Sequence, residues 1–496
     1  MKINESVRRG TWLRLGSPSD GLAAGGKRTF MQLSLGEVAT ILGASCEVPG
    51  RLAEGYSIDS RAIAPGSLFF ALRGPRFDGH EFVGQALERG AAGAVVEQGY
   101  RGQAPVLIRV PDTLRALQDL AQAVRRRWGR RVVAVTGSTG KTTTKELIAA
   151  LLSARFSVHK SPGNLNNQYG VPLTLLGLEP THDVAVVEMG MSAPGEIARL
   201  AQIGEPETGV VTNVAPVHLE FFDSVDAIAC AKRELLQHLK SPSTAVLNYD
   251  DHRVRRFAEG FGGRVVTFGF EAGADFRALG FAPSRDTERP EVGTRFRLEG
   301  PAYASEFYVP LAGRHNVENA LAAIATASVF GVPEREVRVA LHKFTPLHQR
   351  AEILTLAAEI DIINDCYNSN PRAMENMLET LAAWPGAGRR IVVAGEMLEL
   401  GASSPELHRQ VGRKCARSRL DWLMAVQGDA RFFLEGAIEA GLPPERARFF
   451  AAANQAGEFC LTIMQPGDVV LVKGSRGVHL EKVTELLQSS TVRSAL

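Results

Sequence analysis

The sequence predicts an α/β protein of three domains, and three observations support this. The chain has 496 residues, too many for one hydrophobic core. Short apolar segments typical of strands alternate with helical patterns along its length. Many of these strands are rich in valine, which is typical of parallel sheets buried on both faces. We place the domains at residues 31–125, 126–344 and 345–496.

The predicted strands are short and regularly spaced. In the first domain they are residues 67–72, 91–97 and 105–110, followed by the helical pattern "TLRALQDLAQAVRRRW". In the central domain they are residues 132–137, 183–190, 208–214 and 244–248. In the third domain they are residues 360–368, 389–396, 421–428 and 468–475. Strand and helix alternate again in this last stretch, which predicts a doubly wound, Rossmann-like sheet.

The composition excludes several classes of protein. With 45% hydrophobic and 22% charged residues the chain reads as globular. No apolar run approaches the roughly 18 residues of a membrane-spanning helix. The five cysteines are scattered without a C-x-x-C pair, which argues against a disulfide framework or a zinc site and favours a reducing compartment. No basic stripe indicates a nucleic-acid partner.

Residues 1–30 differ from the rest of the chain. They carry six Lys/Arg and two Asp/Glu, a net charge of +4, so the remainder of this +2 chain is about −2. The segment has no apolar stretch of the kind found in a secretory signal. We expect a disordered tail or an upstream start codon, with a targeting segment and a basic contact arm as alternatives.

The stretch "AVTGSTGKTTTKEL" (134–147) follows a predicted strand and enters a predicted helix, as a phosphate-binding loop does. The usual G-x-x-x-x-G-K-[ST] pattern would have glycine at Val135. Glycine residues at 137 and 140 let the backbone bend around phosphate oxygens. Lys141 can reach the β- and γ-phosphates, and the Thr142 hydroxyl can reach Mg²⁺. The residues expected to contact the nucleotide are Gly137, Ser138, Thr139, Gly140, Lys141, Thr142 and Thr143.

Two candidate metal ligands follow successive strands. Glu188 ends the strand "DVAVVEMG", and His218 lies just past the next strand. Ligand sites in open α/β sheets lie at the carboxyl ends of the strands. Taken singly, Glu188 could be a strand-end charge and His218 a structural histidine. Together they favour a metal site beside the nucleotide.

Seven motifs occur in a fixed order: "TGSTGKTTT", "VVEMGM", "TNVAPVHLEFF", "ACAKRELL", "GRHNVENALAA", "NDCYNSNP" and "VAGEMLELG". In this order the chain resembles the Mur ligases of peptidoglycan synthesis over residues 34–480, and the shortened loop is that family's form. Three motifs, at 163–176, 367–371 and 395–401, resemble the members that add D-alanyl-D-alanine to UDP-N-acetylmuramoyl-tripeptide.

The resemblance implies ATP as cofactor, with one or two Mg²⁺. Thr142, Glu188 and His218 would hold the metal, together with Lys232 as a carbamate. A carbamate is an oxygen ligand of the kind that Mg²⁺ prefers, whereas a bare ammonium would repel the ion. Asn316 and Asn319 would contact the adenine. Catalytic roles are implied for Lys141, His218, Lys232 and Arg350.

The outer domains would supply the remaining contacts. Arg350 would reach the ATP phosphates, and Asp365 the ribose or phosphates. Residues implied to bind the substrates are Ser60, Arg61, Gly74, His80, Asn164, Asn167, Asn368, Asn370, Lys473, Ser475 and Arg476, of which those in the first domain would hold the UDP end. The family usually has Ser or Thr where Cys366 stands, which leaves an accessible thiol possible.

The implied reaction converts a carboxylate into an acyl phosphate that an amine then attacks. Its partners would be UDP-N-acetylmuramoyl-tripeptide and D-alanyl-D-alanine, and its products UDP-N-acetylmuramoyl-pentapeptide, ADP and phosphate. We expect a monomer in the bacterial cytoplasm whose domains close over the nucleotide and are open without ligand. Three alternatives are a Mur ligase that adds the third, diamino acid residue, a folylpolyglutamate-synthase-like ligase and a non-catalytic nucleotide switch.

Overall fold

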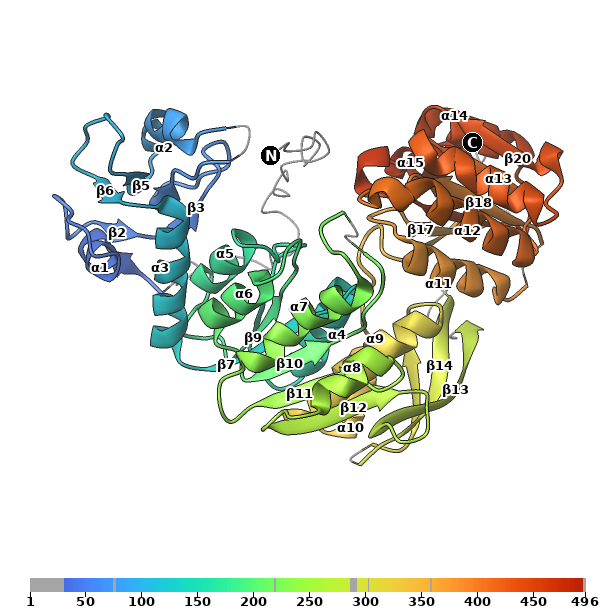
Figure 1. Cartoon of the computed structure of the whole chain (residues 1–496), viewed down its shortest axis with the longest axis horizontal. Helices are drawn as coiled ribbons and strands as arrows, with labels where there is room; N and C mark the ends of the chain where they lie inside the picture. Colours follow the sequence, from blue (N-terminus) through green and yellow to red (C-terminus); the bar gives the residue numbers. More distant parts are fainter. Residues whose placement is uncertain are drawn as a thin grey trace.

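The computed structural model describes residues 31–74, 77–217, 220–285, 292–301, 303–356, 359–386 and 388–493. These residues form three α/β units, each with its own main sheet, and the outer two stand at opposite ends of the central one (Figure 1). The predicted tail, residues 1–30, and the predicted metal ligand His218 lie outside the described ranges. None of the described helices combines the length and apolar character needed to cross a membrane.

The first unit contains a four-stranded parallel sheet of order β3-β4-β5-β6 and a two-stranded ribbon, β1-β2. Its elements are β1 (Leu33–Ser34), α1 (Leu35–Ile41), β2 (Leu52–Ala53), β3 (Gly55–Ser57), β4 (Ser67–Phe70), η2 (Gly79–Phe82), α2 (Val83–Glu88), β5 (Gly93–Glu97), β6 (Leu107–Val110) and α3 (Thr113–Trp128). The three strands predicted from sequence correspond to β4, β5 and β6.

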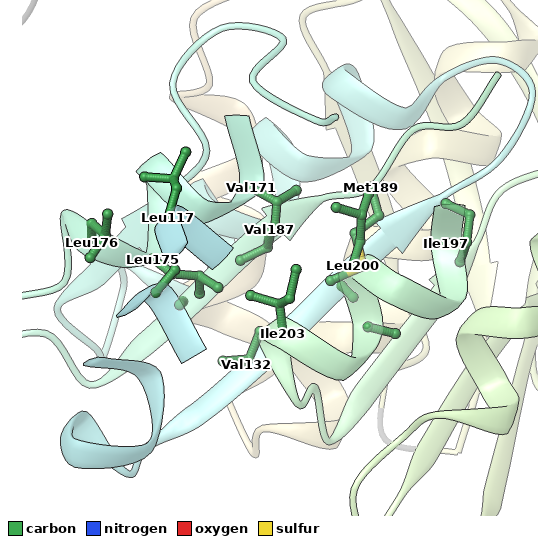
Figure 2. Close-up of a cluster of buried hydrophobic side chains, with 14 of the residues drawn as sticks. Leu117, Val132, Val171, Leu175, Leu176, Val187, Met189, Ile197, Leu200 and Ile203 are labelled. Carbon is green, nitrogen blue, oxygen red and sulfur yellow. The ribbon is translucent and has the colours of Figure 1, made fainter. Parts of the chain in front are cut away.

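Helix α3 joins the first unit to the central one. Its apolar face packs on α5 (Gly170–Leu176) and α6 (Glu196–Gly204), and Figure 2 shows Leu117 beside the side chains of these helices. Near its end Arg125, only 1% exposed, donates to the carbonyls of Gly204 and Glu205 at 2.8 and 3.0 Å and to Glu207 Oε1 at 2.9 Å. One continuous core therefore spans both units.

The central unit is a nine-stranded sheet of order β15-β14-β13-β12-β11-β10-β7-β9-β8. Its strands are β7 (Arg131–Thr136), β8 (Val158–Lys160), β9 (Val184–Glu188), β10 (Thr208–Val211), β11 (Thr244–Asn248), β12 (Arg264–Gly269), β13 (Phe276–Arg285), β14 (Val292–Glu299) and β15 (Glu306–Val309). Its other helices are α4 (Lys141–Leu152), α7 (Val225–Gln237), α8 (His252–Arg255), η3 (Arg256–Ala258), α9 (Arg314–Val329) and α10 (Glu334–His342).

The parallel sheet expected for this unit is confirmed from β8 to β13, but β13, β14 and β15 extend it as an antiparallel arm. The sequence analysis did not predict this arm. Its signal is alternation rather than a continuous apolar run. In β14 buried and exposed residues alternate from Thr294 onward, as expected for a sheet with one face toward water.

The third unit is a six-stranded sheet of order β16-β17-β21-β18-β19-β20, parallel except for the edge strand β16. Its strands are β16 (Glu352–Thr355), β17 (Asp361–Asp365), β18 (Arg390–Gly395), β19 (Trp422–Val426), β20 (Ala447–Phe450) and β21 (Val469–Lys473). Its helices are α11 (Pro371–Ala382), η5 (Gly401–Ser403), α12 (Ser404–Arg417), η6 (Gly428–Ala430), α13 (Arg431–Glu439), η7 (Pro444–Arg446), α14 (Ala453–Ile463), η8 (Arg476–Val478) and α15 (Glu481–Arg493). The four strands predicted here correspond to β17, β18, β19 and β21.

Candidate active site

A cleft of about 770 Å³ lies between the central and third units. Its walls hold most of the residues predicted for nucleotide and peptide. From the central unit they include Ser138, Thr139, Gly140, Lys141, Thr142, Thr143, Asn164, Asn167, Glu188, Asn316 and Asn319. From the third unit they include Arg350, Asp365, Asn368, Asn370 and Lys473. The tertiary structure thus gathers segments more than 300 residues apart at one sheet edge, as the strand-end rule expects.

The loop between β7 and α4 requires glycine at two points. Gly137 has φ 150°, and a Cβ built on it would lie 1.8 Å from Thr212 Oγ1. Gly140 has φ 77°, and its Cβ would lie 2.3 Å from Asn319 Oδ1. Val135 is an interior residue of β7, so the bend begins two residues later than in the longer loop. The missing glycine therefore reflects a shorter turn.

The segment after β10 supports this loop. Asn213 Oδ1 accepts from the backbone N–H of Thr139 at 2.9 Å and from its hydroxyl at 3.1 Å. Thr212 Oγ1 donates to the Thr139 carbonyl at 2.6 Å. The Ser138 hydroxyl donates to the carbonyl of Ala215 at 3.1 Å and accepts from its N–H at 2.8 Å. The side chains of Ser138 and Thr139 thus hold the loop's shape.

Helix α4 begins at the loop without a side-chain cap, because its N-cap is Gly140. The first-turn N–H groups of such a helix suit an anionic ligand. Lys141 Nζ donates back to the carbonyls of Gly137 and Ser138 at 2.9 and 3.4 Å. Burial lowers the pKa of Lys141, the nearby Glu188 carboxylate opposes that shift, and Arg350 adds to it. The Lys141 ammonium is therefore held over the loop by these two carbonyls.

The donors at the expected metal position suit Mg²⁺. Glu188, 1% exposed, accepts from Asn166 Nδ2 at 2.8 Å through Oε1, while its buried Oε2 has no hydrogen-bond partner in the described chain. An unpartnered buried carboxylate oxygen is unusual and fits a cation. The Thr142 hydroxyl also borders the cleft. Among the described residues, no three His, Cys, Asp or Glu side chains lie close enough together to hold a metal ion. Of the expected metal ligands, Glu188 is the described residue that belongs to these four types.

Lys232 lies on α7 and is 2% exposed. Among the described residues its ammonium has no hydrogen-bond or ion-pair partner, and it is not part of the cleft wall. Burial, with a further contribution from Lys141, places the pKa of Lys232 well below its usual value. A buried lysine without an anion beside it is uncommon.

The third unit presents Arg350 at the cleft. Its guanidinium lies 4.0 Å from the Tyr367 ring centroid, and its neighbours Gln349 and Ala351 have φ 61° and 52°. Asp365 accepts from the N–H of Ala351 at 3.1 Å and from Lys473 Nζ at 2.6 Å. A left-handed backbone on both sides of one arginine is costly and is typical of functional positions.

The two asparagines of α9 are joined to the loop helix. Asn319 Nδ2 donates to Asn316 Oδ1 at 3.2 Å, and Asn319 Oδ1 accepts from Thr144 Oγ1 at 3.2 Å. Asn316 Nδ2 donates to the Ala312 carbonyl at 2.9 Å. Beside them His315 lines the cleft with a buried Nδ1 that has no hydrogen-bond partner among the described residues, and burial lowers its pKa to about 4.

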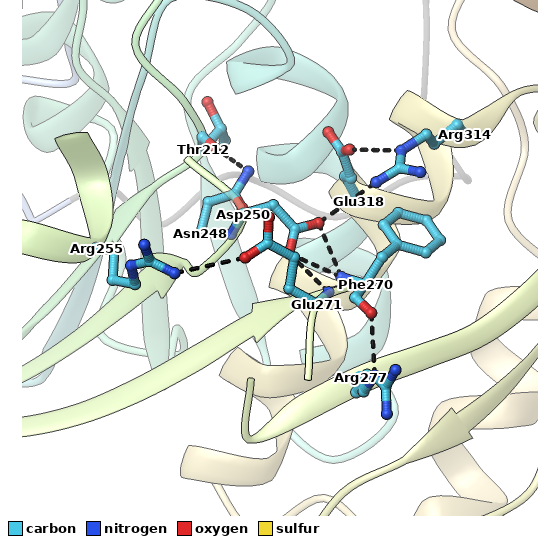
Figure 3. A network of polar contacts seen from close by, with 9 residues as sticks. All are labelled: Thr212, Asn248, Asp250, Arg255, Phe270, Glu271, Arg277, Arg314 and Glu318. Atoms are coloured by element: carbon cyan, nitrogen blue, oxygen red, sulfur yellow. Dashed lines mark hydrogen bonds and ion pairs between the residues drawn. The ribbon is translucent and has the colours of Figure 1, made fainter. Parts of the chain in front are cut away.

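A polar network borders the same cleft (Figure 3). Asp250 accepts from the backbone N–H groups of Phe270 and Glu271 at 2.8 and 2.9 Å, and Arg314 Nη2 lies 3.6 Å from it. Asn248 donates to the Thr212 carbonyl at 2.8 Å and so supports the strand end that holds the loop. This network fixes the ends of β10 and β11 relative to each other.

Several predicted peptide-side residues also have structural partners. Asn370 Oδ1 caps α11 by accepting from the Ala373 N–H at 2.9 Å, and Asn167 Oδ1 accepts from the Gly170 N–H at 2.9 Å at the start of α5. Ser475 donates to the Ser369 carbonyl at 3.3 Å, and the Arg476 guanidinium lies 5.1 Å from the Tyr367 centroid. Ser475 and Arg476 do not line the cleft in the described structure, although they adjoin residues that do.

The residues predicted for the UDP end lie in the first unit and are not part of the cleft. Arg61 is 69% exposed and pairs bidentately with Asp59 at 2.9 and 2.7 Å. The Ser60 hydroxyl donates to Gln85 Oε1 at 2.8 Å, and the Gly74 N–H donates to the Phe77 carbonyl at 2.9 Å.

His80 is 7% exposed, and both of its ring nitrogens are occupied. Nδ1 lies 2.5 Å from Asp78 Oδ1, and Nε2 accepts from the Glu97 N–H at 2.9 Å. In this structure His80 orders the 78–80 turn, and its ring has no nitrogen left for a ligand.

The accessible thiol that the sequence left possible at Cys366 is absent, because this side chain is buried. Cys366 is 1% exposed, its Sγ donates to Asn364 Oδ1 at 3.0 Å, and burial raises its pKa to about 12. The sequence analysis also missed Asn166, Arg372 and Asn376 of the cleft wall. Asn166 stands inside the motif at 163–176, "GNLNNQYGVPLTLL", so its position beside two predicted asparagines was the available signal.

Comparisons with known proteins agree over nearly the whole chain. Residues 53–125 match the model "Mur ligase family, catalytic domain", residues 135–327 the "Mur ligase middle domain" and residues 349–476 the "Mur ligase, glutamate ligase domain". The UDP-N-acetylmuramoyl-tripeptide–D-alanyl-D-alanine ligase of Synechocystis is 38% identical, covering 92% of this chain and 98% of that protein.

Two solved structures are similar throughout. MurF from Acinetobacter baumannii superposes with a TM-score of 0.84 at 30% identity, covering 93% of this chain and 99% of that one. MurF ligase from Thermotoga maritima in complex with ADP superposes with a TM-score of 0.78 at 28% identity, covering 89% and 98%. With three family domains in order and relatives aligned end to end, this chain belongs to the Mur ligase family.

Proposed function

We propose that this protein is an ATP-dependent ligase that joins D-alanyl-D-alanine to UDP-N-acetylmuramoyl-tripeptide, giving UDP-N-acetylmuramoyl-pentapeptide, ADP and phosphate. The cleft carries the proposal. It combines a phosphate loop and the Glu188 carboxylate, whose Oε2 has no hydrogen-bond partner among the described residues, with Arg350, Asp365 and Lys473 from another unit. The similar proteins named for this reaction support the choice of substrates.

The reaction starts at a carboxylate, which cannot acylate an amine because oxide is a poor leaving group. A carboxylate oxygen of the tripeptide attacks the γ-phosphorus of ATP, ADP departs, and an acyl phosphate forms. This step brings anions together, so cations must neutralise them. We assign that task to Lys141 and Arg350, which both line the cleft, and the attraction to phosphate would draw Lys141 off the loop carbonyls that it now contacts.

The amine of D-alanyl-D-alanine then attacks the acyl carbon and loses a proton, and inorganic phosphate leaves. The asparagines of the cleft and Lys473 are the proposed peptide contacts: Asn164, Asn167, Asn368 and Asn370, with Ser475 and Arg476 close by. Water would hydrolyse the acyl phosphate, so approach of the third unit to the central one protects the intermediate.

Thr142, Glu188 and His218 would hold Mg²⁺, which when bound neutralises charge on the transferring phosphates. We include a carbamate on Lys232 in the proposal. The neutral amine nitrogen adds to the carbon of CO₂ and loses one proton, which gives a carbamate anion close to Lys141 on a buried side chain that has no anionic partner among the described residues. Lys232→Ala should abolish turnover, with partial rescue by a short carboxylic acid, whereas full activity would exclude the carbamate.

In the first unit Ser60, Arg61, Gly74 and His80 remain the proposed contacts for the UDP end. For Arg61, which is itself exposed, this requires exchange of its Asp59 partner for a diphosphate, which its planar fork also fits. For His80 it requires release of a buried ring, so Arg61 is the stronger candidate. The proposal includes a monomer in the bacterial cytoplasm with domains bounded near residues 125 and 344.

The decisive experiment measures phosphate release with purified protein and ATP. It compares D-alanyl-D-alanine, a free diamino acid and glutamate as acceptors, each with its matching donor. Turnover with D-alanyl-D-alanine is expected. Turnover with only the diamino acid would indicate a ligase that adds the third, diamino acid residue. Turnover with none of the acceptors would favour a nucleotide switch.

A further inference from the structure

Lys145 is a buried cation that the reaction does not use directly. It lies one turn after Lys141 on α4, and its side chain is fully buried, at 0% exposure. A lysine in the interior is tolerated only when its charge is paired and its donors are satisfied. Lys145 Nζ meets this condition with Glu146 Oε1 at 2.9 Å and the carbonyls of Ser161 and Gly163 at 2.7 and 2.9 Å.

These two carbonyls begin the segment 161–169, which connects β8 to α5. The segment carries Asn164, Asn166 and Asn167 into the wall of the cleft. By holding carbonyls 161 and 163, Lys145 fixes the start of the stretch that presents these asparagines.

The same segment is bonded to the end of β9. The Ser161 hydroxyl accepts from the Glu188 N–H at 3.0 Å, and Asn166 Nδ2 donates to Glu188 Oε1 at 2.8 Å. The Asn166 carbonyl accepts from the Gly190 N–H at 2.8 Å. A displacement of the segment would therefore move the Glu188 carboxylate as well.

Lys145 also acts on that carboxylate through space. Its Nζ lies 4.0 Å from Glu188 Oε2, the oxygen that has no hydrogen-bond partner in the described chain. At this distance a full charge attracts the carboxylate but does not occupy it as a hydrogen bond would. Oε2 is thus oriented and still available to a cation.

We infer that Lys145 is a positioning residue that sets the metal carboxylate and the asparagine segment in one fixed geometry. One buried ammonium would thereby fix the position of the proposed metal ligand Glu188 relative to the asparagines that would contact the peptide end of the substrate. The inference rests on the proposed function for its peptide half, whereas its metal half depends only on Mg²⁺–nucleotide binding.

Lys160 supplies a matched control. It pairs with the same Glu146 carboxylate but comes from the edge strand β8, and its side chain is 47% exposed. Among the described residues its ammonium makes no bond to carbonyls 161 or 163 or to Glu188. Lys160→Met therefore removes a cation from Glu146 while leaving the metal carboxylate and the segment in place.

The test compares Lys145→Met, Lys145→Gln, Asn166→Ala and Lys160→Met with the unmodified protein. Calorimetry gives the ADP dissociation constant with and without Mg²⁺, and the ratio of the two reports metal coupling without turnover. Outer-shell partners of metal ligands change metal affinity about 10- to 100-fold. We expect Lys145→Met to lose at least about tenfold of the Mg²⁺ enhancement, and Lys160→Met to stay within about twofold.

Steady-state kinetics with the tripeptide donor tests the peptide half. Lys145→Met should raise KM for the donor together with the Mg²⁺ concentration for half-maximal rate. Lys145→Gln retains an amide NH₂ group that can donate to the carbonyls but carries no charge. Its KM for the tripeptide should therefore lie closer to normal than its Mg²⁺ requirement. A purely structural role would lower thermal stability without this split.

If Lys145→Met does not fold, Lys145→Gln and Asn166→Ala decide, because Asn166 lies at the cleft surface and bridges the segment to Glu188. Folded variants with an unchanged Mg²⁺ enhancement would overturn the inference, as would an equal loss in Lys160→Met. Failure of the proposed function would show separately, as absent turnover in the unmodified protein with Mg²⁺–ADP binding intact.

Discussion

Gly137→Ala tests whether steric crowding by the strand end after β10 makes glycine obligatory in the loop. The added Cβ would lie 1.8 Å from Thr212 Oγ1 and 3.1 Å from Thr212 Cβ. The threonine must rotate away, which removes its 2.6 Å hydrogen bond to the Thr139 carbonyl, worth about 0.5–1.5 kcal/mol. The backbone at φ 150° costs a non-glycine residue a further 1–3 kcal/mol, roughly.

These two contributions give about 1.5–4.5 kcal/mol. If the loop bears this cost when it adopts its binding geometry, ADP affinity should fall about 10- to 1,600-fold, at about 1.4 kcal/mol per tenfold. Titration calorimetry with ADP and Mg²⁺ measures the loss, and a thermal melt checks that the variant is folded.

Two further variants separate the causes. Gly260→Ala has φ 73° and open space around its Cβ, so it carries a backbone cost without a collision and should leave ADP affinity unchanged. The double variant Gly137→Ala, Thr212→Ala lacks the colliding oxygen and should bind ADP better than the product of the single losses predicts. Strictly additive free energies would refute the collision argument.

The remaining predictions concern pH, thiol chemistry and the connection between units. His315 has a pKa of about 4 in the folded protein against an ordinary 6.5, so its contribution to the free energy of unfolding is fully present above pH 6.5 and is lost as the pH falls toward 4. The difference between the urea midpoints at pH 7 and pH 5 should therefore be smaller in His315→Asn than in the unmodified protein. Iodoacetamide followed by mass spectrometry should label the exposed Cys230 and spare Cys366 in the folded protein, and fast labelling of Cys366 would contradict its burial. Arg125→Met should cost about 3 kcal/mol of unfolding free energy in urea titrations, because it leaves Glu207 without its buried partner, whereas the exposed Arg126→Met should cost under about 1 kcal/mol.

Local patterns were enough for much of this fold. Strands such as 244–248 were predicted to the residue, because a short apolar run bounded by polar residues has few other stable states. The strand–loop–helix context of Lys141 was also readable, since its parts adjoin in sequence. The antiparallel arm of β13–β15 was not predicted, because an alternating pattern indicates which face of a strand is exposed to solvent but not which sheet the strand joins.

Only part of the candidate site could be predicted. Gly137, Glu188 and Arg350 were predicted from motif and position, and the structure places the loop, Glu188 and Arg350 on one cleft. The hydrogen-bond and packing partners of the site residues could not be predicted. That His80 is buried between Asp78 and Glu97, and that Cys366 is shielded, depends on packing from elements distant in the chain.

The sequence by itself determined the class of fold, the order of the units and the family, because each depends on spacings within one segment. The tertiary structure decided which of the polar residues act together. In the sequence, Lys145 cannot be told from any other helix lysine. Its proposed role depends on carbonyls 161 and 163 and on Glu188, which lie next to it only because β8 and β9 pack beside α4. Burial makes these contacts necessary, because a charge removed from water must be paired and hydrogen-bonded by the groups that the fold places around it.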